Sequence, residues 1–395
     1  MLRELRMSMP RRRVLRQLGG GFGALLTGAM LPSSVAMDAT AISCKQKWPA
    51  WEAFKWNFIS RDGRVIDASL ETEGTTSEGQ SYALFFALVA NDQPMFEKVL
   101  NWTENNLADG DLTARLPAWL WGKNKEGQWG VIDSNAASDS DLWIAYALGE
   151  AGRLWDNRRY IALSSLMASR ILREETANIP GLGLTLLPGP IGFTLSPTSW
   201  RLNPSYMPLQ LMQWFAEVGK DTRWAKLLQS SRRIIFESAE QGYSPDWIIY
   251  EQDKGFRIDT EGDEKGEGAY NAIRVYLWAG MLAHESEDRQ RLLDRFAPMA
   301  NLVEQQGYPP ESVNIQTGRS NRAGPPGFSA AMLPFLAASG RTEAVTQQLQ
   351  RLQASPIAAD SYYGQVLGLF GLGWREQRYV FKRSGHLKPM WEGCR

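Results

Sequence analysis

Cysteine and histidine are scarce in this chain of 395 residues. It holds two of each, namely Cys44, Cys394, His284 and His386. A structural zinc site uses about four such side chains grouped closely together, so the sequence predicts no metal site. A phosphate-binding glycine loop and a catalytic-triad motif are also missing from the sequence, and we expect no cofactor.

An excess of positive charge is lacking as well. The chain has 43 basic and 43 acidic residues, and six arginines but only one glutamate fall within residues 1–36. The rest of the chain therefore holds 37 basic and 42 acidic groups, a net charge near −5. Nucleic-acid phosphates bind basic surfaces, so we expect no nucleic-acid partner.

A hydrophobic run long enough to cross a membrane is missing too. Arg11–Arg16 precede a weakly apolar, glycine-rich run from Leu18 to Leu31, which Ser34–Ala36 follow. This order is typical of a twin-arginine export signal over residues 1–36; an uncleaved basic tail is the alternative. The run of about a dozen apolar residues is too short to span a bilayer. We expect no membrane span in the mature chain and a periplasmic or secreted protein.

The two cysteines lie near the two ends of the expected mature chain. In an oxidising compartment, Cys44 and Cys394 would form a disulfide, which requires the chain ends to meet. Two unpaired thiols are the alternative.

From Pro49 onward, apolar residues recur three and four positions apart in about twelve segments, a spacing typical of helices. Almost no run alternates in the manner of a strand. The expected helices span 49–60, 78–91, 93–107, 138–155, 157–174, 204–218, 221–239, 269–284, 286–306, 327–338, 341–353 and 360–373. We therefore predict an all-α fold.

The links between these helices alternate in length. Short links follow the even-numbered helices, whereas long links rich in Gly, Pro, Trp and Tyr precede most of them. The long links span 61–77, 108–137, 175–203, 240–268 and 307–326. In an up-and-down helical array, this alternation places every long loop at one end.

The even-numbered helices are apolar nearly all round. Examples are SYALFFALVA at 81–90, LWIAYAL at 142–148 and VYLWAGML at 275–282. Such helices lie inside other helices. We expect six inner helices ringed by six outer ones, an (α/α)6 barrel that forms a single domain over residues 44–395. Closure of the ring would bring the two cysteines together.

Polar side chains far apart in the sequence fall at the N-terminal ends of inner helices, which open onto the loop-bearing end. They are Glu78, Asp139, Tyr206 and Asn271. Capping is the simpler explanation for the two acids, because Ser77 with Gln80 and Ser138 with Asp141 fit capping patterns.

The long loops carry many aromatic residues in otherwise polar segments. They are Trp119, Trp121, Trp129, Trp200, Trp247, Tyr243 and Tyr308. The apolar face of a sugar ring is a suitable partner for an exposed indole; rings that plug the barrel end as core are the alternative. A cleft with carboxylates and aromatic rings indicates glycan hydrolysis.

Several longer segments carry a family resemblance. SEGQSYALFFALVAND at 77–92, ASDSDLWIAYALGEAGRLW at 137–155, NPSY at 203–206 and YNAIRVYLWAGM at 270–281 together resemble glycoside hydrolase family 8. LPAWLWGK at 116–123, YSPDW at 243–247, GYPPE at 307–311 and GFSAAMLPF at 327–335 resemble its branch encoded with bacterial cellulose synthases. The resemblance implies an (α/α)6 barrel, an inverting mechanism and a β-1,4-glucan substrate.

The resemblance also implies roles for residues. Glu78 matches the proton donor, whose pKa must be raised by a partly dry site or by a negative charge such as Asp139. Asp139 matches a second catalytic carboxylate, which would steady the distorted sugar. The implied substrate-binding residues are Tyr82, Trp119, Trp121, Trp200, Tyr206, Tyr270 and Arg274.

The chain departs from the family pattern at Asn271, where the family's Tyr-Asp-Ala-x-Arg segment supplies the catalytic base. An amide holds a water molecule but does not take its proton. Three readings stay open: another carboxylate serves, Asp139 serves, or the protein binds glucan with weak or no turnover. Nearby candidate acids are Asp259, Glu261, Asp263, Glu264 and Glu267.

Three hypotheses of function follow. The first is an endo-β-1,4-glucanase that cleaves with inversion during bacterial cellulose biosynthesis. The second is a glucan-binding pseudoenzyme or scaffold of the cellulose synthase complex, because of Asn271. The third is a hydrolase of xylan, chitosan or mixed-linkage glucan.

Overall fold

The computed structural model describes residues 47–259 and 265–394. The predicted export signal lies outside these residues, as do Cys44 and three of the candidate acids, Glu261, Asp263 and Glu264. Residues from Lys47 onward form one compact unit. Cys394 is disulfide-bonded, and its pairing with Cys44 stays a prediction.

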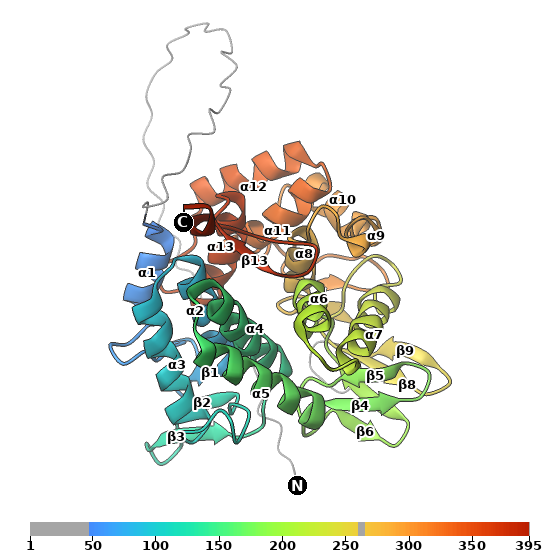
Figure 1. Cartoon of the computed structure of the whole chain (residues 1–395). Helices are drawn as coiled ribbons and strands as arrows, with labels where there is room; N and C mark the ends of the chain where they lie inside the picture. The colour runs from blue at the N-terminus through green and yellow to red at the C-terminus, as the bar shows by residue number, and fades with distance from the viewer. Residues whose placement is uncertain (1–46, 260–264, 395) are drawn as a thin grey trace, which may run out of the picture. The chain divides into compact units, whose positions relative to one another are not determined.

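Helices dominate this unit (Figure 1). They are α1 (Pro49–Phe58), α2 (Ser77–Val89), α3 (Gln93–Leu107), α4 (Ser138–Trp155), α5 (Arg158–Glu174), α6 (Leu209–Val218), α7 (Arg223–Glu237), α8 (Ala272–Gly280), α9 (Glu287–Arg295), α10 (Ala297–Gln306), α11 (Pro326–Ala338), α12 (Thr342–Ala354) and α13 (Tyr362–Arg375).

The inner helices are α2, α4, α6, α8, α11 and α13, as the sequence predicts. In α2, every residue except Glu78 is buried, and all nine residues of α8 are buried. Phe370 of α13 packs against Phe85 and Phe86 of α2, with ring centroids 5.5 and 4.6 Å apart, and this contact joins the last inner helix to the first. The (α/α)6 barrel is confirmed.

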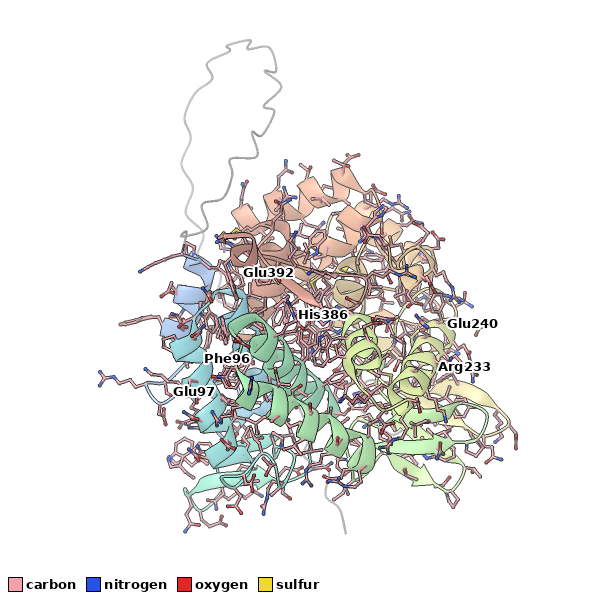
Figure 2. All side chains as sticks on the ribbon, viewed as in Figure 1. Phe96, Glu97, Arg233, Glu240, His386 and Glu392 are labelled. Atoms are coloured by element: carbon pink, nitrogen blue, oxygen red, sulfur yellow. The ribbon has the colours of Figure 1, made fainter. Side chains whose placement is uncertain are left out.

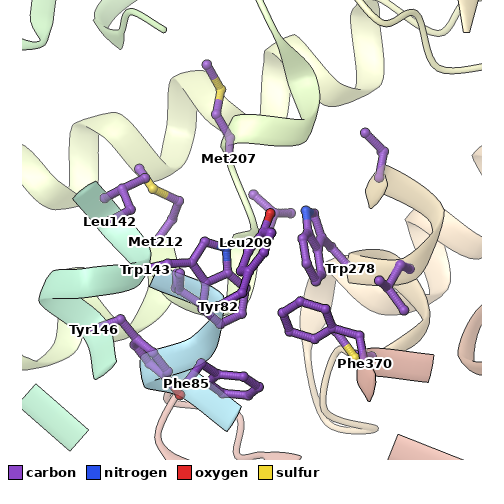
Figure 3. Packing of buried hydrophobic residues seen from close by; sticks show 14 of the residues in the cluster. Tyr82, Phe85, Leu142, Trp143, Tyr146, Met207, Leu209, Met212, Trp278 and Phe370 are labelled. Carbon is purple, nitrogen blue, oxygen red and sulfur yellow. The ribbon is translucent and has the colours of Figure 1, made fainter. Parts of the chain in front are cut away.

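Aromatic side chains fill the centre of the ring (Figure 3). The Trp143 ring lies 5.0 Å from Phe85, 5.9 Å from Tyr82 and 5.3 Å from Trp278. These rings come from three inner helices, α2, α4 and α8. One aromatic cluster therefore packs these helices together at the centre of the barrel.

Two of the predicted helices are interrupted. The segment 204–218 begins as a short 3-10 helix, Pro204–Tyr206, and the α-helix starts only at Leu209 after Pro208. The segment 286–306 breaks at Phe296 into α9 and α10, because Pro298 in the first turn of α10 lacks the N–H that a continuous helix would use.

The long loops contain short strands that the sequence pattern does not reveal. They contain β1 (Thr75–Thr76), β2 (Leu120–Lys123), β3 (Trp129–Asp133), β4 (Thr176–Ile179), β5 (Gly183–Leu186), β6 (Thr194–Ser196), β7 (Ser199–Leu202), β8 (Ile248–Glu251), β9 (Gly255–Ile258), β10 (Glu267–Gly268) and β11 (Val313–Asn314). All pairings are antiparallel. Strands of two to five residues are too short to show a periodic signal.

A C-terminal hairpin, β12 (Tyr379–Phe381) with β13 (Leu387–Pro389), is fastened to the inner ring. Fully buried Glu150 of α4 accepts hydrogen bonds from Trp214 Nε1 at 2.7 Å and Leu387 N at 2.8 Å. The Nδ1 atom of His386, a residue labelled in Figure 2, lies 2.8 Å from the same carboxylate. Arg153 Nη2 donates to the same carboxylate at 2.6 Å. Both carboxylate oxygens are thus satisfied inside the fold.

Within residues 47–259 and 265–394, no helix combines the length and the apolar character that crossing a membrane requires.

Candidate active site

Glu78 lies in the first turn of α2, and capping does not explain it. The cap is Thr76, whose side chain accepts from Gly79 N at 3.1 Å. Gln80 does not close the expected capping box: its amide donates to Thr103 Oγ1 at 2.9 Å and accepts from Val65 N at 2.6 Å. The Glu78 side chain keeps 25 % of its surface exposed.

Asp139 lies in the first turn of α4, where the cap residue Ala137 makes no side-chain hydrogen bond. Its Oδ1 accepts from Ser140 N at 2.8 Å. The hydroxyls of Ser140 and Ser77 lie 2.6 Å apart, which ties the first turns of α4 and α2 together. The two acids therefore face a common point although 61 residues separate them.

Arg274, from the first turn of α8, lies at that point. Its Nη1 contacts the carboxylates of Glu78 and Asp139, the latter at 3.3 Å, and donates to Tyr82 Oη at 2.9 Å. Its Nη2 donates to Asn271 Oδ1 at 2.7 Å and to Ser205 Oγ at 3.1 Å. One guanidinium thus fixes three of the predicted catalytic positions, while only 4 % of the residue is exposed.

The separation between the two acids is short. Because one nitrogen contacts both carboxylates, their nearest oxygens lie within about 6 Å of each other. An inverting glycosidase needs roughly 6.5–9.5 Å between its acid and its base so that water fits between them. Asp139 therefore fails the distance test for a replacement base.

The pair instead holds a proton. Burial, followed by the negative charge of Glu78, raises the pKa of Asp139 to about 7, although Arg274 opposes the rise. A hydrogen bond between the two carboxyl groups adds to the increase. Near neutral pH, the Glu78–Asp139 pair therefore retains one proton that an acid catalyst needs.

Asn271 lies directly before α8 and makes no capping hydrogen bond itself. Asp246 takes over that role, because its Oδ1 accepts from Asn271 N at 3.0 Å and Ala272 N at 2.6 Å. The amide of Asn271 is thereby held in place at both its backbone and its side chain.

The comparisons with known proteins agree with this geometry. The family model for glycosyl hydrolases family 8 matches residues 27–377. The chain belongs to this family. An "Endoglucanase" of Escherichia coli O157:H7 is 48 % identical over 361 residues, 91 % of this chain and 96 % of that protein. An "Endoglucanase" of Xanthomonas axonopodis pv. citri is 44 % identical over 97 % of this chain and 98 % of that protein.

A solved family 8 structure shows the same arrangement of helices. The endo-1,4-D-glucanase from Vibrio fischeri ES114 superposes with a TM-score of 0.81 at 46 % sequence identity. The match covers 87 % of this chain and 99 % of that chain.

Among the acids that could stand in for the family 8 base, Asp259 has another partner, and Glu261, Asp263 and Glu264 lie outside the described residues. Asp259 accepts from Arg201 Nε at 2.6 Å and is 2 % exposed. The backbone of Glu267 pairs with Asn314 across the β10–β11 ladder and the residue is half-buried, so its carboxylate stays a candidate. A base from the remaining loop acids stays a prediction.

The aromatic residues predicted to bind substrate divide into half-buried and buried ones. Trp119 and Tyr206 are half-buried beside the site: Trp119 O accepts from Ser77 N at 3.0 Å, and the Arg274 guanidinium lies 5.8 Å from the Tyr206 ring. Tyr82 and Trp200 are 1 % and 5 % exposed. Substrate contact by these two residues stays a prediction, and their burial means that it would involve only a small part of each side chain.

Sequence reasoning missed Phe193. Its ring stacks on that of Trp247, with centroids 5.9 Å apart and an interplanar angle of 8°. The Tyr206 ring lies 5.9 Å from the same Trp247 ring. Tyr270, also predicted to bind substrate, is half-buried and donates to Glu311 at 2.9 Å. Phe193 sits in a Gly- and Pro-rich loop without any periodic signal, so only the tertiary contacts reveal it.

Proposed function

We propose that this family 8 protein is an endo-β-1,4-glucanase that cleaves with inversion. The observation that carries the proposal is the guanidinium of Arg274, which contacts Glu78, Asp139 and Asn271 at once. The relatives named as endoglucanases cover nearly the whole chain, so they support the same substrate class.

Glu78 is the proton donor in this account. It is the more exposed member of the carboxyl pair, at 25 % against 3 % for the Asp139 side chain. A glycosidic oxygen can therefore approach Glu78 from solvent, while the negative charge of the more buried Asp139 helps to keep a proton on the pair. The positive charge of Arg274 holds both carboxyl groups in place.

Asn271 holds the attacking water but does not remove its proton. The acid half of an inverting site is thus complete, and the base half lacks a basic atom at the expected position. We infer that hydrolysis is slow, because the water proton leaves to solvent instead of to a positioned carboxylate.

A glucan-binding protein without turnover is the second candidate, and Asn271 is the observation that favours it. The proposed export signal would place either protein in the periplasm or outside the cell. Association with a cellulose synthase complex belongs to the same proposal and rests on the sequence resemblance alone.

Hydrolysis of a polymer panel tests the proposed function. Purified mature protein should release reducing ends from carboxymethylcellulose, and NMR of fresh cello-oligosaccharide products should show the α-anomer first. The matched Glu78→Gln protein should release none. Faster release from xylan or chitosan than from cellulose would overturn the substrate class, and β-anomeric products would overturn inversion.

A further inference from the structure

The hairpin of β2 and β3 carries an indole platform. The rings of Trp121 and Trp129 stack 5.2 Å apart at 16°, and Trp102 meets the edge of Trp121 at 5.3 Å and 83°. Trp129 nevertheless keeps 47 % of its surface exposed. Trp121, which the resemblance implied as a sugar contact, is therefore the backing of the stack, and Trp129 offers its outer surface.

Two basic side chains frame the platform. The Arg64 guanidinium lies 4.6 Å from the Trp121 centroid and 4.7 Å from that of Trp129, and Lys123 Nζ lies 5.8 Å from Trp129. Arg64 is itself fixed, because its Nε donates to Thr75 Oγ1 at 2.9 Å. The guanidinium and the ammonium thus bring hydrogen-bond donors over the stacked rings, and Trp102 supports Trp121 at its edge.

The strand ladder that carries the platform also reaches the first turn of α2, where Glu78 lies. Trp119 O accepts from Ser77 N, next to Glu78, and Thr75 pairs with Trp121 across the β1–β2 ladder. The strand then leads away from the catalytic helix, and Trp129 pairs with Lys123 at its far end. Four residue steps along a strand cover about 13 Å, which exceeds the length of two sugar units.

We propose that Trp129 forms a distal binding site for the β-1,4-glucan chain, outside the positions where the bond is cleaved. The inference rests on the proposed function for its ligand. A glucose ring presents an apolar face to the indole, and its hydroxyls bond to Arg64 and Lys123. The site favours chains long enough to reach from Glu78 to the hairpin.

Trp56 supplies a matched control. It is 89 % exposed on α1, an outer helix, and among the described residues it stacks on no other ring. The two residues therefore differ in support, because Trp129 stacks on Trp121 and lies on the strand ladder that reaches the first turn of α2.

Binding in a non-hydrolysing background tests the inference. In the Glu78→Gln protein, calorimetry would give affinities for cellohexaose and cellotriose, before and after Trp129→Ala or Trp56→Ala. We expect Trp129→Ala to weaken cellohexaose binding roughly fivefold and to leave cellotriose binding unchanged. Trp56→Ala should change neither. An unchanged thermal midpoint in Trp129→Ala would show that the fold is intact.

The possible outcomes distinguish failure of the distal site from failure of the proposed function. Equal cellohexaose affinities with and without Trp129 would overturn the distal site and leave the proposed function standing. Loss of both affinities in Trp129→Ala would also overturn it, because the effect would then lie at the catalytic centre. If the background protein bound xylohexaose and not cellohexaose, the proposed substrate would be wrong, and the distal site for β-1,4-glucan would fall with it.

Discussion

Arg274 donates a hydrogen bond from Nη2 to Oδ1 of Asn271 over 2.7 Å. An aspartate at this position would have nearly the same shape and would accept the same bond. The guanidinium would also favour its ionised form. The surroundings of Asn271 therefore suit a carboxylate. The site differs from one with an active base only in that a side-chain amide stands where the carboxylate would be.

Replacement of Arg274 by lysine should disable catalysis without unfolding the protein. A lysine ammonium lacks the planar fork that reaches both the carboxyl pair and Asn271. Misplacement of catalytic groups by about 1 Å costs roughly 100-fold in rate, so kcat should fall at least that far.

The matched control is Arg233→Lys, in an exposed ion pair with Glu237 on α7 (Figure 2). It should leave kcat on carboxymethylcellulose unchanged. Equal losses in the two variants would mean that the Arg274 contacts have no special role.

The value of kcat/KM should fall on the alkaline side only. Because the pKa of Asp139 is raised to about 7, the proton on the Glu78–Asp139 pair is lost as pH rises through that value, and kcat/KM should fall above it. Asn271 does not titrate, so the acidic side should stay flat down to the pH at which the fold fails. A bell-shaped profile in the unmodified protein would reveal a carboxylate base elsewhere.

Asp139→Asn should stabilise the protein at alkaline pH while it removes activity. The folded pKa of Asp139 lies above its unfolded value, so the native state binds the extra proton between about pH 4 and 7. The free energy of unfolding therefore falls as pH rises through this window, and the full decrease is present above it. The variant should melt at least about 2 °C higher than the parent at pH 8, with a smaller difference at pH 5. Calorimetric scans at the two pH values would check this, and a lower melting temperature at pH 8 would contradict it.

Glu150→Gln should loosen the C-terminal hairpin. Burial alone would raise the pKa of Glu150, but the hydrogen bonds from His386 and Arg153 outweigh it and lower the pKa. A lowered pKa stabilises the fold above the unfolded value, and this contribution is lost as pH falls through the folded one.

Removing one partner of such a buried pair costs about 3–5 kcal/mol. Urea unfolding at pH 7 would show this loss, and the gap to the parent should shrink towards pH 3. Equal unfolding midpoints at pH 7 would indicate that the network carries no stability.

The helices were predictable because the inner ones are apolar on every side, as in α8, and because loop lengths alternate. The short strands were not, since their pairing depends on residues far away in the sequence: Trp200 in β7 pairs with Tyr250 in β8. The same applies to Phe193, whose role appears only once Trp247 is placed against it.

Within the site, the positions of Glu78, Asp139 and Asn271 followed from helix ends. The structure raises the pKa of Asp139, which the sequence did not indicate. Burial decides this, and no local pattern shows that Asp139 lies behind Glu78. The sequence resemblance implied a sugar contact at Trp121, whereas only the structure shows that Trp129 stacks on it and stays 47 % exposed.

The rate of glucan hydrolysis by Asn271→Asp tests the central claim most directly. A positioned base contributes roughly 100- to 10,000-fold to such reactions. The account predicts at least a tenfold higher kcat on carboxymethylcellulose than the unmodified protein, a similar KM, and a new loss of activity on the acidic side of the pH profile. Asn271→Ala, which removes the bond from Arg274, should show no gain. A kcat for Asn271→Asp equal to or below that of the unmodified protein would contradict the claim that only the base is missing from this site.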